Sequence, residues 1–378
     1  MRICVSAFMV TTTPGMRLAG VGRHMFATLN QLTITDLGHQ YDVFIRDDVE
    51  MPDSWKICPW ITWHPIKIRN SRDRIWWEHF RIGAVAKELG ADLVLSLFLA
   101  VPFGCKIPIV VFAHDAFPRT HGDWFPFRKR MILDWLTLTA CKKSTAVVTG
   151  SESSKSELAS AYKVSPEKIF VIPYGVGNDL KMLTPTELGS IDLSKFKAER
   201  YVFSVGTIEP RKNIEGLIRA FSLLKKDSRM EDYRLLIAGA KGWLDSPVGI
   251  TWSESEVKDD IEFLGYVTDL ELNALMQKAS AYVLASFVEG FGLPVLEAMT
   301  VGTPVVCSNT SSLPEVCGDC GFYCDPTSPQ SISEAMLLAL TNTTEAKDKA
   351  TAGIARTSQF SWYESVKKLE IACQFAVN

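Results

Sequence analysis

The sequence has no apolar run long enough to cross a membrane. A transmembrane helix needs about 20 consecutive apolar residues, whereas the best candidate, residues 91–105, is shorter and contains Asp92 and Pro102. A secretory signal is also missing, because the apolar start (residues 1–10) leads into Thr-Thr-Thr-Pro-Gly instead of a small-residue cleavage site. We therefore expect a cytoplasmic protein whose first apolar residues form a strand.

Cysteine shows no disulfide or metal-site pattern. The chain has nine cysteines, an odd number, and nothing indicates an oxidising compartment, so we expect reduced thiols. Cys317, Cys320 and Cys324 are spaced like a metal knuckle, but they supply only three of the four ligands that a structural zinc site requires. We interpret them as core or loop thiols.

A strong charge of either sign is also lacking. The net charge is −3, which argues against nucleic acid as a partner. Residues 1–180 carry a net +4 and the remainder a net −7. This difference is compatible with an anionic partner for the first half, and equally with chance.

Two common motifs are absent. There is no Gly-x-Gly-x-x-Gly fingerprint, which weighs against a nicotinamide oxidoreductase. There is also no Asp-x-Asp pair of the kind that clamps a diphosphate through a divalent metal. We therefore expect neither a metal site nor a cofactor.

What is present is a repeated alternation of short apolar runs and amphipathic stretches. The length of 378 residues favours two domains. The alternation predicts an α/β fold with two doubly wound parallel sheets. We place a first Rossmann-like domain at 1–180 and a second at 181–355, with a final helix at 356–378 that packs back towards the first domain. Predicted strands are 2–10, 41–46, 91–98, 107–115, 144–151, 168–175, 201–206, 233–239, 261–265, 281–286, 304–308 and 321–325.

Ligands of such sheets bind beyond the carboxyl ends of the strands, so the loops there are the candidate sites. In the first domain, the glycine-containing loop 11–24 leads into a helix whose N-terminus suits a phosphate; a plain turn is an equally good interpretation. His114 follows an apolar strand, where it could contact a reacting sugar or form a structural pair with Asp115.

In the second domain, Arg211 and Lys212 lie between a strand and a helix that Asn213 is expected to cap. Two fixed cations can stabilise the negative charge of a departing diphosphate without a metal. Further on, Glu289 lies in a glycine-containing loop and Glu297 on the helix after it. Their carboxylates can accept hydrogen bonds from sugar and ribose hydroxyls. Backbone N–H groups that could meet the sugar belong to Phe291, Gly292 and Leu293.

These motifs together resemble glycosyltransferase family 4, whose members have the two-domain GT-B fold. The resemblance rests on "GTIEPRKN", "EGFGLPVLEAMTVGTPVV" and "LPEVCGD" in the second half and on "GVGRH", "AHDAFP" and "VVTGSESSK" in the first. It implies an enzyme that transfers a sugar from a nucleotide donor with retention of configuration and without metal. By the same resemblance, Arg211, Lys212, His114 and Glu289 are catalytic, and the donor-binding residues are Gly20, Gly22, Gly206, Arg211, Lys212, Tyr266, Glu289, Phe291, Gly292, Leu293 and Glu297.

The substrates are less well indicated. We expect UDP-glucose as donor, with GDP-mannose as the alternative, and a saccharide or lipid-linked acceptor of polysaccharide synthesis. Two basic and aromatic segments, 67–83 and 124–143, are compatible with an anionic membrane surface and also with ordinary helices on the sheet. A phosphorylase or epimerase of the same fold, or a partner protein that binds nucleotide sugars without catalysis, remains an alternative. The sequence gives no oligomeric state.

Overall fold

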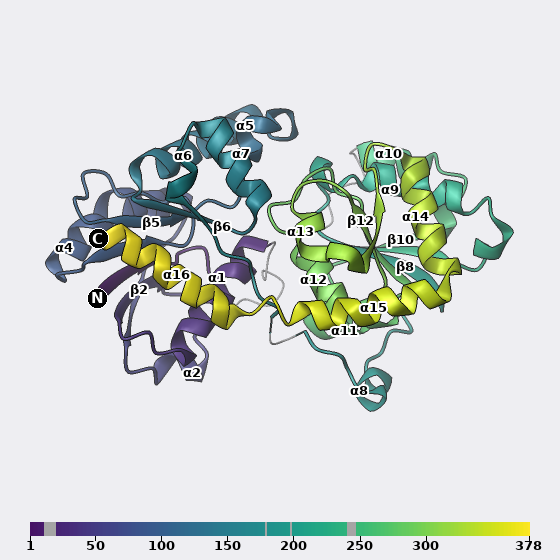
Figure 1. The fold of residues 1–378 in the computed structure, drawn as a ribbon, viewed down its shortest axis with the longest axis horizontal. Coiled ribbons are helices and arrows are strands. Elements are labelled where there is room, and N and C mark those ends of the chain that lie inside the picture. Colours follow the sequence, from purple (N-terminus) through teal and green to yellow (C-terminus); the bar gives the residue numbers. More distant parts are fainter. Residues whose placement is uncertain (11–19, 178–179, 197–198, 240–246) are drawn as a thin grey trace. The chain divides into compact units, whose positions relative to one another are not determined.

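The computed structural model describes residues 1–10, 20–177, 180–196, 199–239 and 247–378. The chain divides into two compact units (Figure 1). Unit 1 consists of residues 1–175 and 361–378, and unit 2 of residues 176–360. None of the described helices combines the length and apolar content that a membrane crossing requires.

The sheet of unit 1 is parallel, and its strand order reverses direction at the first strand. From one edge to the other, its strands are β3 (Ile61–Ile66), β2 (Gln40–Arg46), β1 (Arg2–Ser6), β4 (Leu93–Ser96), β5 (Ile109–Phe112), β6 (Ala146–Thr149) and β7 (Ile169–Val171). Six of these were predicted. We missed β3, in which Pro65 interrupts the strand pattern; the strand tolerates this proline because it lies at the sheet edge, where one row of N–H groups needs no partner.

Helices cover both faces of this sheet, and each face has its own apolar core. Successive strand residues point to opposite faces, so that Ile3 and Val5 belong to one core and Cys4 to the other. The first core also takes Leu29 and Leu369. The helical segments of unit 1 are α1 (Gly20–Ile34), α2 (Asp53–Lys56), α3 (Ser71–Trp76), the π-helical η1 (Trp77–Arg81), α4 (Ile82–Glu88), α5 (Phe117–Thr120), η2 (Gly122–Trp124), α6 (Phe127–Lys143), α7 (Glu152–Tyr162), η3 (Pro166–Lys168) and α16 (Trp362–Val377).

Unit 2 repeats this architecture. Its parallel strands run in the order β10 (Ile261–Gly265), β9 (Arg234–Ala238), β8 (Tyr201–Val205), β11 (Ala281–Leu284), β12 (Val305–Ser308) and β13 (Gly321–Cys324). All six were predicted. The helical segments are α8 (Pro185–Ser190), η4 (Pro210–Lys212), α9 (Ile214–Leu224), η5 (Ser228–Met230), α10 (Pro247–Ser253), η6 (Lys258–Asp260), α11 (Asp269–Lys278), α12 (Leu293–Thr300), α13 (Leu313–Cys317), η7 (Gly318–Cys320), α14 (Pro329–Thr341) and α15 (Thr343–Thr357).

The C-terminal helix α16 belongs to unit 1 although it follows unit 2 in the chain. Its apolar face, which includes Val366, Leu369 and Cys373, lies in the core that α1 also lines. Where the chain returns to unit 1, a Cβ added to Gly175 would lie 2.3 Å from the backbone nitrogen of Trp362. A side chain at position 175 would therefore push the two crossing segments apart.

The cysteines carry free thiols, and the three that resembled a metal knuckle are buried. Cys317, Cys320 and Cys324 lie in α13, η7 and β13, next to one another along the chain. All three thiols lie in the interior of unit 2.

Candidate active site

The candidate donor site of unit 2 lies where the strand order of its sheet reverses. Strands β8 and β11 are neighbours in the sheet; the strand that follows β8 in the chain, β9, lies on one side of this pair, and the strand that follows β11, β12, lies on the other. A crevice forms outside the carboxyl ends of strands at such a point. The loops that follow these two strands are joined directly, because the backbone N–H of Phe287 donates to the carbonyl of Arg211 at 2.8 Å.

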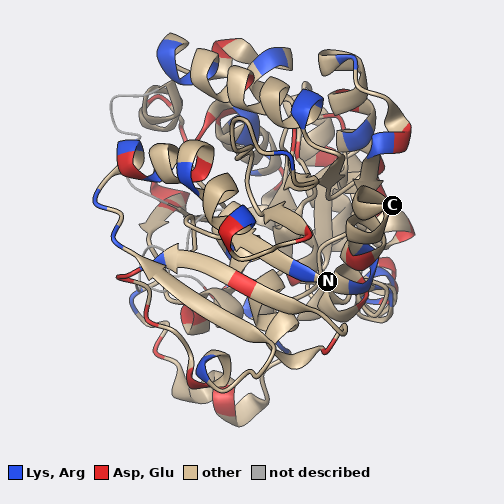
Figure 2. Cartoon of the chain, turned by 90° about the vertical axis from the view of Figure 1, so that its left-hand side faces the viewer, with Lys and Arg blue, Asp and Glu red and all other residues tan. Residues whose placement is uncertain are grey.

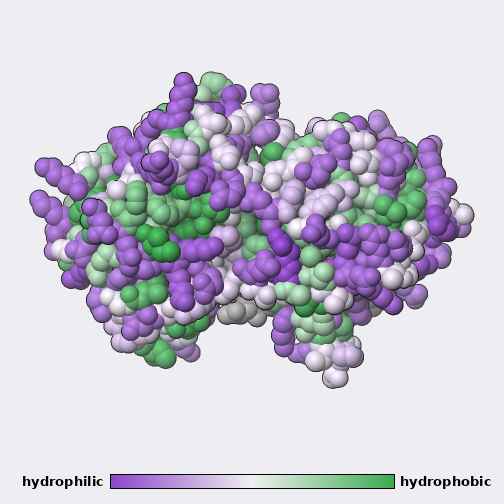
Figure 3. Space-filling view, in the orientation of Figure 1, coloured by the Kyte–Doolittle hydropathy of each residue, from purple (hydrophilic) through white to green (hydrophobic). Residues whose placement is uncertain are grey.

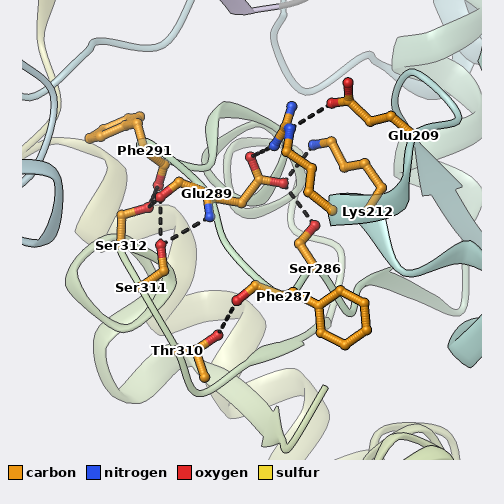
Figure 4. A network of polar contacts seen from close by, with 10 residues as sticks. Glu209, Lys212, Ser286, Phe287, Glu289, Phe291, Thr310, Ser311 and Ser312 are labelled. Carbon is orange, nitrogen blue, oxygen red and sulfur yellow. Dashed lines mark hydrogen bonds and ion pairs between the residues drawn. The ribbon is translucent and has the colours of Figure 1, made fainter. Parts of the chain in front are cut away.

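A buried carboxylate connects the predicted residues of these two loops (Figure 4). Glu289 accepts hydrogen bonds from Lys212 Nζ at 2.6 Å and from Arg211 Nη1 at 2.6 Å. The oxygen that faces Lys212 also accepts the hydroxyl of Ser286 at 2.7 Å. Arg211 is held from its other side by Glu209, at 2.5 Å. The structure therefore brings Arg211, Lys212 and Glu289 together.

The charges of this cluster depend on one another. Burial alone would raise the pKa of Glu289, but Lys212, Arg211 and the Ser286 hydroxyl outweigh it and hold that pKa at about 2. Burial lowers the pKa of Lys212, against the attraction of Glu289. Both carboxylate oxygens of Glu289 accept hydrogen bonds from these residues, so the carboxylate holds the two cations in place.

Two serines that sequence reasoning missed hold the Glu289 loop. Ser311 donates to the carbonyl of Glu289 at 2.6 Å and accepts its N–H at 2.9 Å. The hydroxyl of Ser312 lies 2.8 Å from the carbonyls of both Glu289 and Phe291. The only signal for them is their place directly before the "LPEVCGD" motif. Gly292 follows with φ +104°, a conformation that favours glycine, and α12 begins at the next residue.

Asn213 does not have the role we expected. Its side chain makes no cap hydrogen bond at the start of α9. The amide group donates instead to the carbonyl of Ala285 at 3.0 Å and to that of Pro326 at 2.7 Å. The predicted cap is wrong because these carbonyls, brought close by the sheet, provide partners that the local sequence does not reveal.

The remaining predicted donor residues occupy the same carboxyl edge of unit 2. Gly206 follows β8, and a Cβ there would lie 3.2 Å from Lys212 Cε, so glycine leaves room for that side chain. Tyr266 follows β10 and is 56% exposed. Leu293 opens α12, and the buried Glu297 lies one turn further along that helix.

In unit 1, His114 lies two residues beyond β5 and contacts residues from three other segments. Its Nδ1 is 2.5 Å from the Tyr174 hydroxyl, a partner that the sequence did not indicate. Asp115 accepts the N–H of Phe117. The ring of His24, from α1, lies 5.1 Å from His114 and 4.5 Å from Tyr174. Sequence reasoning missed His24, although it ends the quoted motif "GVGRH".

Two of the predicted phosphate-loop glycines lie in the described part of α1. Gly20 is its first described residue and is exposed, and Gly22 is half-buried, with open space where a Cβ would project. The preceding loop, including Gly15, lies outside the described residues.

Burial controls the protonation of the two histidines. It lowers the pKa of His114 to about 4, and it lowers the pKa of His24 well below the usual value, with a further contribution from His114. Nδ1 of His24 and Nε2 of His114 are buried with no hydrogen-bond partner among the described residues. At neutral pH both rings are therefore uncharged.

This arrangement predicts that unit 1 loses stability in acid. Below about pH 6.5 the unfolded chain binds a proton at His114, whereas the folded protein binds this proton only below about pH 4. The free energy of unfolding therefore falls between these two pH values. The part due to His114 is about 3 kcal/mol. Urea unfolding followed by tryptophan fluorescence, at several pH values, should show a weaker pH dependence for His114→Phe than for wild type. Identical pH profiles would contradict the prediction.

Comparison with known proteins identifies the family. Residues 18–179 match the model of "Glycosyltransferase Family 4" and residues 190–356 that of "Glycosyl transferases group 1", which together take in most of the chain. The chain belongs to glycosyltransferase family 4. The resemblance stated from the sequence is thus confirmed.

Two similar proteins of known description come from bacteria. The chain is 38% identical over 251 residues to "O-antigen chain mannosyltransferase B" of Escherichia coli, a match that takes in 66% of this chain and 65% of that protein. It is 29% identical over 255 residues to "O-antigen chain mannosyltransferase RfbU" of Salmonella typhimurium, over 64% of this chain and 67% of the other. The match thus spans slightly less than two thirds of the length of the Escherichia coli relative.

Solved structures establish the fold. Sucrose-phosphate synthase from Thermosynechococcus elongatus superposes with a TM-score of 0.75 at 16% identity, over 99% of this chain and 98% of that one. WaaG, a glycosyltransferase of lipopolysaccharide biosynthesis, superposes with a TM-score of 0.73 at 17% identity, over 98% of each chain. This family member has the GT-B fold that the sequence predicted.

Proposed function

We propose that this glycosyltransferase transfers a mannosyl group from a nucleoside diphosphate donor to a growing saccharide, without a metal and with retention of configuration. The observation that carries the proposal is the pair Arg211 and Lys212, fixed by Glu289 at the carboxyl edge of the unit 2 sheet. These cations are in place before any ligand arrives, so little reorganisation is needed when charge develops.

The reaction follows from this placement. As the bond between the anomeric carbon and the donor phosphate breaks, the departing diphosphate oxygen gains negative charge next to Arg211 and Lys212. Positive charge grows on the anomeric carbon, and an acceptor hydroxyl attacks it from the same face. The acceptor proton passes to the departing phosphate oxygen, so the products are a glycoside and a nucleoside diphosphate. Within unit 2, Glu289 serves this step by holding both cations.

The choice of mannose comes from the relatives. Both of the relatives described above are named as mannosyltransferases of O-antigen chains. We therefore rank GDP-mannose above the UDP-glucose that we expected from the sequence, and an O-antigen-like saccharide or its lipid-linked form as acceptor. We expect the nucleotide base of the donor to bind near Tyr266, whose exposed ring can stack on it.

Thermal unfolding with GDP, UDP, ADP and their sugar conjugates, without added metal, tests the donor. A ligand at 100 times its dissociation constant stabilises the native state by about 2.7 kcal/mol, which raises the melting temperature by several degrees. We expect the largest shift with guanosine nucleotides. A larger shift with uridine nucleotides would favour UDP-glucose as the donor. No shift at millimolar ligand would contradict the assignment of a nucleotide-sugar site.

A second measurement separates catalysis from mere binding. Anomeric configuration and nucleotide release are followed by NMR with GDP-mannose and an oligosaccharide acceptor in the presence of a chelator. We expect an α-mannoside from the α-linked donor. Binding without any release of nucleotide would favour a non-catalytic partner protein, and activity abolished by the chelator would contradict metal independence.

A further inference from the structure

One side of unit 1 exposes large apolar side chains on two helical segments. On α6, Phe127, Met131 and Trp135 recur every four residues and so form a stripe along one face of the helix. That stripe faces solvent, since Phe127 is 74% and Met131 53% exposed. The buried side of the same helix carries Leu136, Ala140 and Cys141 together with Thr137 and Thr139. α6 therefore has an additional apolar stripe that is turned outward and is not needed for packing within unit 1.

The second segment, α3 with η1, continues this surface. Trp76 and Phe80 are 52% and 58% exposed. The ring of Phe103 connects the two segments, at 5.2 Å from Phe80 and 6.0 Å from Trp135. We call this surface the α6 face and define it by residues Trp76, Phe80, Phe103, Phe127, Met131, Ile132 and Trp135. Scattered apolar residues are normal on a protein surface, but a connected group of this size marks an interaction site.

Basic residues surround the α6 face. Segment 124–143 contains five Lys and Arg residues and one acidic residue. Segment 67–83 contains five Lys and Arg residues and two acidic residues. Blue ribbon marks Lys and Arg along the uppermost helices of Figure 2, where α6 lies. Arg128 and Lys129 are exposed next to Phe127. Lys143 lies 5.2 Å from the ring of Phe103, so positive charge also flanks the far end.

Two of the three acidic residues of these segments pair with arginines within the protein, and the third, Asp73, accepts the backbone N–H of Arg69 at 2.9 Å. Asp134 accepts two hydrogen bonds from Arg119, at 2.8 and 2.9 Å. Glu78 is buried and accepts from Arg74 at 3.0 Å. The charge that the α6 face presents outward is therefore positive. Exposed aromatic and aliphatic side chains within a ring of cations are complementary to the interface of an anionic lipid bilayer.

We propose that the α6 face docks unit 1 onto an anionic membrane surface. Phe127, Ile132 and Trp135 enter the boundary between headgroups and acyl chains, while Arg128 and Lys129 pair with lipid phosphates. This contact goes beyond the donor chemistry and does not depend on which nucleotide sugar is used. Membrane docking explains why α6 exposes an apolar stripe, which packing within unit 1 does not explain.

Vesicle sedimentation of the full-length protein tests the proposal. The vesicles contain phosphatidylcholine alone or with about a third phosphatidylglycerol. We expect binding to the anionic vesicles only, weakened at high salt because exposed charges are screened. Charge reversal by Arg128→Glu with Lys129→Glu should lower the partition coefficient at least about tenfold. Replacement of the apolar stripe by Phe127→Ser, Met131→Ser and Ile132→Ser should also lower it at least about tenfold.

Matched controls come from α16, another helix of unit 1. Apolar side chains also gather on the side of unit 1 where α16 lies in Figure 3, and Ile371 and Val377 are exposed. Ile371→Ser with Val377→Ser, and Lys367→Glu with Lys368→Glu, should leave binding unchanged. All variants should keep the nucleotide-induced rise in melting temperature, which reports the donor site independently.

Three outcomes would overturn the proposal. The first is no binding of wild type to anionic vesicles even at low salt. The second is an equal loss of binding in the α16 variants, which would mean unspecific attraction. The third is a wild-type dimer that the apolar-stripe variant converts to a monomer without any lipid binding, because the α6 face would then be covered by a second copy of the chain.

Discussion

Arg211→Ala should lower kcat about 10²- to 10³-fold, a loss comparable to the removal of one preorganised donor from an oxyanion site. The Arg211 side chain is held by Glu209 and Glu289 on either side, so its position is fixed before the diphosphate leaves. Because its charge matters most when the leaving group becomes negative, turnover should fall more than the affinity for free nucleotide. Steady-state kinetics and nucleotide titration on the same preparation measure both effects.

The matched control is Arg219→Ala. Arg219 is an exposed arginine of the same unit, on α9, and its nearest carboxylate, that of Glu215, is 3.9 Å away. It should leave kcat and nucleotide affinity at the wild-type values. Arg211→Lys keeps the charge but loses the planar fork, so its kcat should lie between those of wild type and Arg211→Ala. An unchanged kcat in Arg211→Ala would remove this residue from the mechanism.

Glu289→Ala should destabilise unit 2 by about 3–5 kcal/mol, the usual cost of breaking a buried ion pair from one side. The substitution leaves Lys212, which is 7% exposed, next to Arg211 with no opposing buried carboxylate. Glu209→Ala is the matched control, since Glu209 also pairs with Arg211 but its side chain is 36% exposed. Its loss should cost at most about 1 kcal/mol.

Hydrogen exchange of the β8 and β11 amides measures these costs where they arise, because the loops of the site follow these strands. The double variant Lys212→Met with Glu289→Leu should recover most of the stability, because it removes both buried charges together. Equal protection in Glu289→Ala and Glu209→Ala would contradict the prediction.

The stability that Glu289 contributes depends on pH with a defined sign. The lowered pKa of Glu289 contributes stability above pH 4.5, which is lost as the pH falls towards 2.

The positions of the donor loops could be predicted from the sequence alone. Each apolar run of unit 2 became a strand, and the loops with Gly206, Arg211 and Glu289 follow strands as expected. Alternating apolar and amphipathic segments leave few ways to bury both faces of a sheet, and parallel strands place their carboxyl ends along one edge. Local pattern failed at the edge strand β3, where Pro65 interrupts the strand pattern.

What the sequence could not provide were contacts between distant segments. It identified Arg211, Lys212 and Glu289 as candidates, but only the neighbouring positions of β8 and β11 showed that one carboxylate holds both cations. Asn213, predicted as a helix cap, binds carbonyls that lie 72 and 113 residues away along the chain.

The histidine cluster of unit 1 illustrates the same division. The cluster joins four segments of the chain. His24 lies in α1 and His114 in the loop after β5, while Tyr174 follows β7 and Trp362 begins α16. Their rings contact one another. The sequence determined the elements, because periodicity and turn chemistry act over a few residues. The tertiary structure alone decided which polar groups meet and how burial shifts their pKa values, because both depend on packing between segments that are remote in the chain.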